Sequence, residues 1–474
     1  MLGVHRLTTA GAEYYLADLA QELPLLLPLP AEERGQAVWS GRAAEGLGLR
    51  GAIDPAQLQA VLDGRHPTAA HRLRSEQATV LGFDLTFSAP KSVSVVFALG
   101  GEEAARQVVA AHREGVQGAL RYVESHALST RRGSGEEREV VPTTGLVAAS
   151  FTHGVNRNLD PHLHTHVVMA NMVHGLDGRW GACDHRGLSA HRAAASAVYE
   201  SHLRAGLTSR LGLRWVETPG LRTEVGGVSL HLLGEFSSRA ADIRRHMAEQ
   251  GAHSARGARV AWAVTRPTKQ AGLDFGELSS EWERRARSFG SPRREMAAVL
   301  APRPARGPAQ TVDEHRFGAT LSLAPDGAAR RRDVVAAFAT AAVDGADEHG
   351  LEQLTQLWTP PLSDRAQVGV AEDSRTLRSV IPGGHLLATL GPRPLDPVDH
   401  EVWRDAARAI DDYRTHWGVT KGGDALGGDA LPSGISSLPT ERLIDHLQTA
   451  RHIETACQRL GWRPARAHEM DRGR

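Results

Sequence analysis

The chain has 474 residues, with 55 Lys and Arg against 55 Asp and Glu, so its formal net charge is zero. This length predicts two or three domains with a buried core. The neutral balance excludes a globally cationic surface and leaves open a local basic groove for nucleic acid. Its two cysteines, Cys183 and Cys457, lie far apart, which excludes a disulfide framework and a thiolate metal site and is typical of a reducing compartment.

The N-terminal region contains the segments AEYYLAD and, further on, LPLLLPLP. The first holds Tyr14 and Tyr15; adjacent tyrosines usually serve packing, so this pair alone does not identify a nucleophile. The second is too short and too rich in proline to be a signal-peptide core or a membrane span. We therefore expect a cytoplasmic protein with no membrane insertion.

The segment FDLTFS alternates apolar and polar residues, which predicts a strand with Phe83, Leu85 and Phe87 on one face and Asp84 on the other. The following PKSVSVVFAL predicts a helix, because proline is favoured in the first helical turn. A long amphipathic helix is predicted for residues 104–127.

The segment NLDPHLHTHVVMAN places three histidines within five residues, directly before a run that is apolar on both faces, as in a central strand. Residues two apart in a strand point the same way, so His164 and His166 share a face and could share a metal ion. A third ligand is needed. Both His162, in the same phase, and His153, at the end of the preceding strand, are candidates that spacing alone does not separate.

The dipeptide DG in HGLDGRWGACD predicts an antiparallel hairpin, and a helix is predicted for residues 189–211. Residues 291–397 are rich in Pro, Gly and charge, which predicts a linker with short elements. Residues 398–474 contain two amphipathic helical segments, one with Trp403 and Ile410 on its apolar face. The fold class is therefore α+β, with a smaller, mainly helical C-terminal region.

Together, GFDLTFSAPKSVSVVFAL, FTHGVNRNLDPHLHTHVVMAN and the tyrosine pair resemble the relaxase domain of MobF-class conjugative relaxases of the TrwC and TraI type. These are HUH endonucleases that nick plasmid DNA at a transfer origin. The resemblance covers residues 1–290 and implies a central antiparallel sheet with flanking helices, the HUH palm-like relaxase fold.

The resemblance also implies site residues. His153, His164 and His166 fall on the family's metal ligands, whereas His162 matches a non-ligand position. Tyr14 falls on the nucleophile.

Asp84 falls on an acidic residue that orients a metal histidine and helps the tyrosine to lose its proton, and Tyr15 is a further catalytic candidate. Arg266 and Lys269 in VTRPTKQ match a basic stretch, which makes them candidates for binding the DNA backbone; Lys91 is a third candidate.

The implied reaction is nicking and rejoining of single-stranded DNA through a 5′-phosphotyrosine, assisted by a divalent metal ion (Mg or Mn, with Zn as the alternative) and without a nucleotide cofactor. Implied partners are single-stranded DNA at the transfer origin, accessory relaxosome proteins, a separate helicase and a secretion-system coupling protein.

Two features depart from the family's large members. The stretch QELPLLLPLP contains no second tyrosine pair, and the 474 residues contain no GK dipeptide, hence no phosphate-loop lysine in the GxxxxGK[ST] pattern. We therefore expect no helicase or ATPase activity from these residues. Other hypotheses are a metal-dependent phosphohydrolase or nuclease that uses water, a non-catalytic DNA-binding remnant of a mobile element, and an HUH replication initiator.

Overall fold

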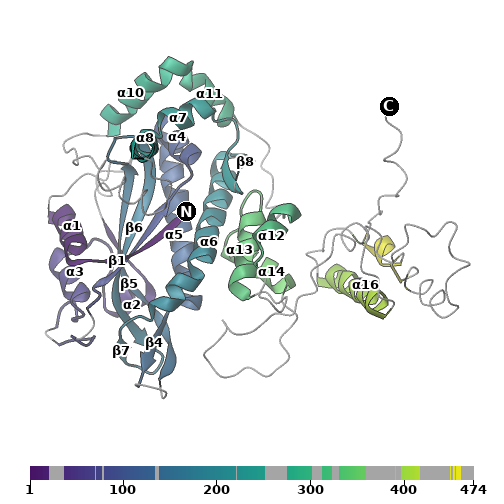
Figure 1. The fold of residues 1–474 in the computed structure, drawn as a ribbon, viewed down its shortest axis with the longest axis horizontal. Coiled ribbons are helices and arrows are strands. Elements are labelled where there is room, and N and C mark those ends of the chain that lie inside the picture. Colours follow the sequence, from purple (N-terminus) through teal and green to yellow (C-terminus); the bar gives the residue numbers. More distant parts are fainter. Residues whose placement is uncertain are drawn as a thin grey trace, which may run out of the picture. The chain divides into compact units, whose positions relative to one another are not determined.

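The computed structural model forms two compact units, Met1–Leu377 and Arg378–Arg474 (Figure 1). It describes residues 1–20, 37–69, 71–76, 79–133, 138–219, 221–250, 275–301, 312–322, 330–358, 390, 397–416, 449, 452–453 and 455–460. Among the described helices, none combines the length and the apolar character needed to cross a membrane.

The strands of the first unit are β1 (Leu2–Leu7), β2 (Val38–Ser40), β3 (Gly82–Ser88), β4 (Ser129–Arg132), β5 (Glu139–Val155), β6 (Pro161–Gly175), β7 (Trp180–Gly181), β8 (Trp215–Thr218) and β9 (Arg222–Val225). Its helices are α1 (Thr9–Ala20), α2 (Arg42–Gly46), α3 (Pro55–Leu62), α4 (Lys91–Leu99), α5 (Glu102–His126), α6 (His185–Leu211), α7 (Leu230–Glu235), α8 (Ser238–Glu249), α10 (Phe275–Ala286), η3 (Arg287–Phe289), α11 (Pro292–Val299), α12 (Glu314–Thr320), α13 (Arg331–Ala341) and α14 (Glu348–Trp358).

One antiparallel sheet with the strand order β1-β3-β6-β5-β2 forms the centre of this unit. Strand β6, which carries the predicted histidines, lies in the middle. Strand β4 pairs with the start of β5, and β7 pairs with the end of β6. Helices α1 and α3 cover one face, and α5 and α6 cover the other (Figure 1). The predicted α+β fold and the DG hairpin, which is β6–β7, are confirmed.

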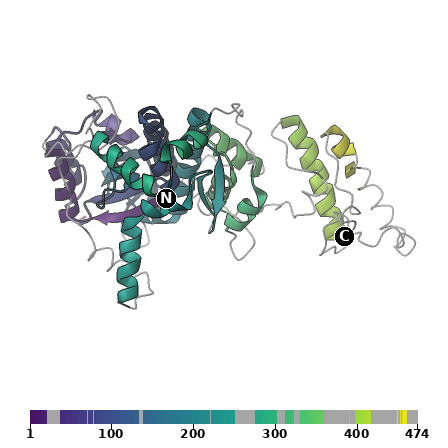
Figure 2. The same cartoon turned by 90° about the horizontal axis from the view of Figure 1, so that it is seen from above.

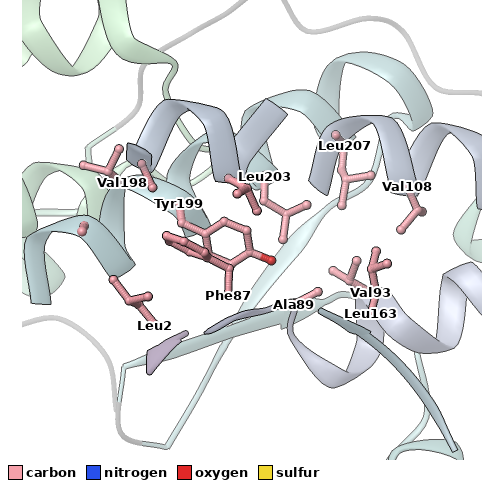
Figure 3. Close-up of a cluster of buried hydrophobic side chains, with 14 of the residues drawn as sticks. Leu2, Phe87, Ala89, Val93, Val108, Leu163, Val198, Tyr199, Leu203 and Leu207 are labelled. Atoms are coloured by element: carbon pink, nitrogen blue, oxygen red, sulfur yellow. The ribbon is translucent and has the colours of Figure 1, made fainter. Parts of the chain in front are cut away.

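Strand alternation determines which layer each side chain enters. In β3, Phe83, Leu85 and Phe87 are buried against the α4–α6 layer, as their spacing predicts. The ring of Tyr199 from α6 lies against Phe87, with ring centroids 5.4 Å apart. Figure 3 shows its hydroxyl group directed toward the side of the cluster where Val93 lies.

The helices that support the site have clear end signals. Helix α6 begins after Asp184, whose carboxylate accepts a hydrogen bond from the backbone N–H of Arg186, and it ends at Gly212, which has the left-handed φ of 62°. The predicted helix after FDLTFS is α4, although it begins at Lys91, so that Pro90 is its N-cap and not a residue of its first turn. Helix α8 projects from the body, and none of its residues is buried (Figure 2).

The described part of residues 291–397 is more ordered than the linker with short elements that the sequence predicts, because α13 packs on α6 and α14 packs on α13. Arg204 of α6 is 3% exposed and donates hydrogen bonds to the carbonyl oxygens of Ala339 (2.6 Å) and Ala342 (3.0 Å). The valines and alanines of α13 are buried, and the Pro- and Arg-rich residues that flank this short helix obscure it in the sequence. The compact unit thus continues well past the expected boundary at residue 290.

In the second unit, α16 (Pro397–His416) buries Trp403, Ile410 and Tyr413. These side chains pack with Ile453 and Cys457. The predicted apolar face of the first C-terminal helix is confirmed, while most of the second predicted helix lies outside the described residues.

Candidate active site

Three histidines meet where β5 and β6 pair beside the loop that joins them. His153 and His164 are direct partners across the two strands, and Phe151 is the partner of His166. Because side chains alternate along a strand, His153, His164 and His166 all project on the α1 face of the sheet. Their rings are close, with centroids 5.1 Å apart for His164 and His166 and 5.2 Å apart for His153 and His164.

The three histidines form a metal-binding group by geometry. Each offers one ring nitrogen, and these nitrogens lie within 4.8 Å of one another. A metal–nitrogen bond is about 2.1 Å long, so small ring movements bring all three nitrogens to one ion. No other group of His, Cys, Asp or Glu among the described residues satisfies this criterion.

Hydrogen bonds fix the orientation of two of these rings. His166 Nδ1 lies 3.0 Å from both carboxylate oxygens of Asp84, and His164 Nδ1 lies 2.8 Å from the backbone oxygen of His162. Each contact engages Nδ1 and leaves Nε2 for a metal, which is the usual arrangement around ligating histidines. His162 therefore contributes through its backbone, and its ring stacks on that of His164.

The surroundings favour the protonation states that metal binding needs. Burial, followed by the charge of His166, lowers the pKa of His164 to about 4, so that His164 is neutral near pH 7. Burial alone raises the pKa of Asp84, but the hydrogen bond and charge of His166 and the hydrogen bonds from Tyr15 and Thr86 outweigh it and lower that pKa. Asp84 is thus an ionised acceptor.

The two tyrosines of α1 have different environments. Tyr15 is 4% exposed, its ring lies 5.0 Å from that of Phe151, and its hydroxyl group donates to Asp84 at 2.7 Å. Tyr14 is only partly buried, and the guanidinium carbon of Arg157 lies 5.9 Å from its ring centroid. Asp84 thus contacts Tyr15, whereas the resemblance led us to expect that it serves the nucleophile Tyr14.

Arg157 is a site residue that the sequence analysis did not identify. It lies in the loop between β5 and β6, four positions after His153, and that position is the only signal in the sequence. The loop is held by Asn156, whose side-chain oxygen accepts from the backbone N–H groups of Asn158 (2.8 Å) and Asp160 (3.0 Å). Leu159 adopts a left-handed φ of 59°, a conformation that costs energy for a non-glycine residue.

Helices α8 and α10 hold the same loop from outside. Asp160 is fully buried; it forms an ion pair with Arg285 at 3.0 Å and accepts a hydrogen bond from Ser238 at 2.6 Å. Trp282 donates from its indole nitrogen to the backbone oxygen of Leu159 at 2.8 Å. A loop fixed from both sides gives the histidines and Arg157 defined positions.

The predicted DNA-binding residues have different outcomes. The ammonium group of Lys91 donates to the backbone oxygen of Pro161 at 3.0 Å, and burial lowers its pKa. This contact ties the start of α4 to the start of β6. Arg266 and Lys269 lie outside the described residues, so their roles stay predictions.

Comparisons with known proteins agree with this geometry. The TrwC relaxase family model matches residues 7–289. The multifunctional conjugation protein TraI of Escherichia coli is 35% identical over 272 residues, and TraI of strain K12 is 35% identical over 268 residues. Each match covers 53% of this chain and 14% of TraI, so the chain spans about a seventh of the length of these relatives.

Two solved structures of the conjugative relaxase TrwC are also similar. One is a metal-bound complex with OriT DNA, with 26% identity and a TM-score of 0.54. The other is a complex with a 27-mer DNA comprising the recognition hairpin and the cleavage site, with 26% identity and a TM-score of 0.53. Each match covers 61% of this chain and 99% of the TrwC chain.

Proposed function

Because the chain belongs to the TrwC relaxase family, we propose that it is a conjugative relaxase that nicks and rejoins single-stranded DNA at a transfer origin. The observation that carries this proposal is the convergence of the three histidines of β5 and β6 with the tyrosine pair of α1 on one face of the sheet. We place the relaxase domain from residue 1 to about residue 358, because α13 and α14 share the core of α6.

Tyr14 is the proposed nucleophile, since it is the more exposed tyrosine of the pair. Its phenolic oxygen loses a proton and bonds to phosphorus, while the bond from phosphorus to the 3′ oxygen breaks. The released 3′ oxygen takes up a proton, and the 5′ phosphate stays on Tyr14. Rejoining reverses these steps and needs no nucleotide, because the phosphodiester's energy is retained. We assign Arg157 to neutralising charge at the scissile phosphate, because its guanidinium carbon lies 5.9 Å from the ring centroid of the proposed nucleophile Tyr14.

Asp84 holds His166 and Tyr15 in place. A carboxylate that accepts from the Nδ1–H of a ligating histidine fixes its tautomer and makes the other nitrogen a better ligand. We therefore assign Asp84 to orienting the site, and Tyr15 to keeping that carboxylate in position.

His153, His164 and His166 would hold a divalent metal ion, which supplies Lewis-acid stabilisation of charge on the phosphate oxygens. All donor atoms in this set are imidazole nitrogens, and the Asp84 carboxylate is engaged elsewhere. Such a set suits a transition metal better than Mg²⁺. Of the metals expected from the sequence, we therefore favour Zn²⁺, since Mn²⁺, like Mg²⁺, prefers oxygen ligands.

The proposal extends to partners and location. The reaction takes place in the cytoplasm on unpaired DNA, with accessory relaxosome proteins and a separate helicase to expose the site, and with a coupling protein to deliver the adduct to a secretion system. In this assignment the 474 residues supply the strand-transfer step without ATP hydrolysis.

A denaturing gel tests the central claim. Purified protein, incubated with a single-stranded oligonucleotide from its own element's transfer origin and with Zn²⁺, Mn²⁺ or Mg²⁺ in parallel reactions, should give a covalent protein–DNA band with a free 3′-hydroxyl on the other product. Cleavage that leaves no covalent band would indicate the alternative, a nuclease that uses water. Binding without cleavage would indicate a non-catalytic remnant.

A further inference from the structure

A buried polar network lies on the opposite face of the two strands that carry the metal ligands. His112 of α5 is fully buried; its Nδ1 lies 2.8 Å from the hydroxyl oxygen of Tyr199, and its Nε2 lies 2.8 Å from Oγ1 of Thr165. Thr165 in turn lies 2.9 Å from the hydroxyl oxygen of Thr152. The network thus joins α6, α5, β6 and β5 in one chain of hydrogen bonds.

The position of the two threonines relates this network to the metal site. Thr165 stands between His164 and His166 in β6, and its cross-strand partner Thr152 directly precedes His153 in β5. Because successive side chains of a strand point to opposite faces, the threonines face α5 and α6, while the histidines face α1. The three ligands and the network therefore share the same stretch of backbone.

Hydrogen bonding inside this apolar layer is highly directional. Burial lowers the pKa of His112 to about 3, so its ring is neutral and has one N–H donor and one acceptor nitrogen. Each nitrogen therefore needs a partner of the matching kind, and a slip of β6 against α5 would leave buried polar atoms without hydrogen bonds, which is unfavourable. Satisfied networks of this kind specify one packing arrangement over its neighbours.

We propose that His112 is a positioning residue for the metal centre: through Thr165 and Thr152 it fixes β5 and β6 where His153, His164 and His166 project. This inference rests on the proposed function, since it presumes that the three histidines bind a metal. It assigns a role to a histidine that touches neither the metal site nor DNA. Figure 3 shows Tyr199, the outer end of the network, within the apolar cluster that holds it.

The test is titration of the full chain with Co²⁺, whose visible absorption reports the geometry of its ligands. Thr165→Val keeps the side chain's shape and removes both of its hydrogen bonds. It should weaken Co²⁺ binding about tenfold, the lower end of the range for changes behind metal ligands, and should shift the absorption bands. His112→Leu should do the same. His112→Gln, whose amide offers a donor and an acceptor, should restore part of the affinity and the wild-type bands.

The chain offers a matched control. Tyr122 of α5 and His191 of α6 form a second buried tyrosine–histidine hydrogen bond between the same helices, at 2.9 Å, ten residues along α5 from His112, or about 15 Å. Tyr122→Phe should lower the melting temperature and leave the Co²⁺ affinity and spectrum unchanged.

The outcomes separate the two proposals. Thr165→Val and His112→Leu proteins that melt earlier but bind Co²⁺ with the wild-type affinity and spectrum would reduce the network to a packing role and overturn the inference. If a variant does not fold, Tyr199→Phe, which removes one hydroxyl group at the network's outer end, should give a smaller change of the same kind, and its absence would count equally against us. Wild-type protein that binds no Co²⁺ would instead contradict the metal site itself.

Discussion

The Tyr15 hydroxyl group donates to the Asp84 carboxylate at 2.7 Å. That contact gives the two adjacent tyrosines of α1 different roles. The Tyr15 ring is buried against Phe151, and its hydroxyl group is hydrogen-bonded to Asp84. Tyr14, in contrast, lies at the edge of the site beside Arg157. A nucleophile must reach a DNA phosphate, and Tyr14 is the better placed of the two.

Replacing each tyrosine separately tests this difference. Tyr14→Phe should abolish the covalent adduct with origin DNA. Tyr15→Phe should retain part of it, because the change removes the hydroxyl group that donates to Asp84, a hydrogen bond to a charged acceptor worth about 1.5–3 kcal/mol, and leaves Tyr14 in place. Quantification of the covalent band on a denaturing gel decides the matter, and an undiminished band in Tyr14→Phe would overturn the assignment.

The ligand set can be tested by alanine substitution. His153→Ala, His164→Ala and His166→Ala should each lose metal and cleavage. His162→Ala should keep a bound ion, because the hydrogen bond that orients His164 goes to the backbone oxygen of His162, which alanine retains, and only the ring stacking on His164 is lost. Metal analysis of the purified variants checks this prediction; an essential His162 beside a dispensable His153 would contradict it.

Much of this site could be predicted from residue spacing. The period of two in FDLTFS and HLHTH placed Asp84, His164 and His166 on faces that the structure confirms. Spacing alone could not decide whether His153 or His162 is the third ligand, since that depends on the register of β5 and β6, which places His153 opposite His164. Register between strands is set by the whole sheet, and local periodicity does not contain it.

Other features escaped prediction because their causes are tertiary. Nothing in the loop sequence indicates that the Arg157 side chain lies over Tyr14, which is far away in the chain. Likewise, the sequence of α13 resembles the loose basic region around it. Its helical structure depends on packing against α6, where Arg204 donates hydrogen bonds to the last carbonyl groups of α13. Short helices gain most of their stability from such packing, which composition does not report.

The contacts of α13 lead to a prediction about fragments. A fragment ending at residue 290 should be less stable than one ending at residue 360 by roughly 3 kcal/mol or more, since it exposes the buried faces of α6 and leaves Arg204 without its acceptors. Urea unfolding of the two fragments measures the difference. Equal stability would show that α13 and α14 are accessory to the relaxase core.

The same fragments locate DNA binding. The fragment ending at residue 360 should bind single-stranded origin DNA with an affinity that falls steeply as salt rises, because phosphate contacts release counterions. Fluorescence anisotropy across a salt series gives the slope. If residues 378–474 bound the DNA instead, the domain assignment would be wrong.

Buried histidines make the stability of the metal-free protein depend on pH. Burial lowers the pKa of His112 to about 3 and that of His202 to about 4, from an ordinary 6.5. As pH falls from 6.5 toward 4, the unfolded chain takes up protons that the folded chain does not, so the free energy of unfolding falls. Each histidine contributes a slope of about 1.4 kcal/mol per pH unit in this window.

Urea unfolding in the presence of a chelator measures that slope. For His202→Gln, the slope of the free energy of unfolding against pH should be smaller than for the wild type by the contribution of one histidine. Above pH 6.5, these histidines should cause little change of stability with pH in either protein. An unchanged slope in His202→Gln would mean that His202 becomes protonated in the folded state.

The final prediction concerns the energy source for strand separation. The 474 residues contain no GxxxxGK[ST] sequence, so they supply no phosphate-loop lysine for ATP. The purified chain should therefore show no DNA-stimulated ATPase and no strand displacement, yet it should join a cleaved, 5′-bound strand to a fresh 3′-hydroxyl. Supercoiling, accessory proteins or a separate helicase would have to expose its unpaired substrate. Termination of transfer by these 474 residues is also constrained, because they contain no second tyrosine pair: a second cleavage by them must use Tyr15, a released Tyr14 or another copy of the chain. ATP turnover that co-purifies with the chain through successive columns would refute the motorless assignment, and a second cleavage that is retained by Tyr15→Phe protein already joined to DNA through Tyr14 would exclude Tyr15 from that step.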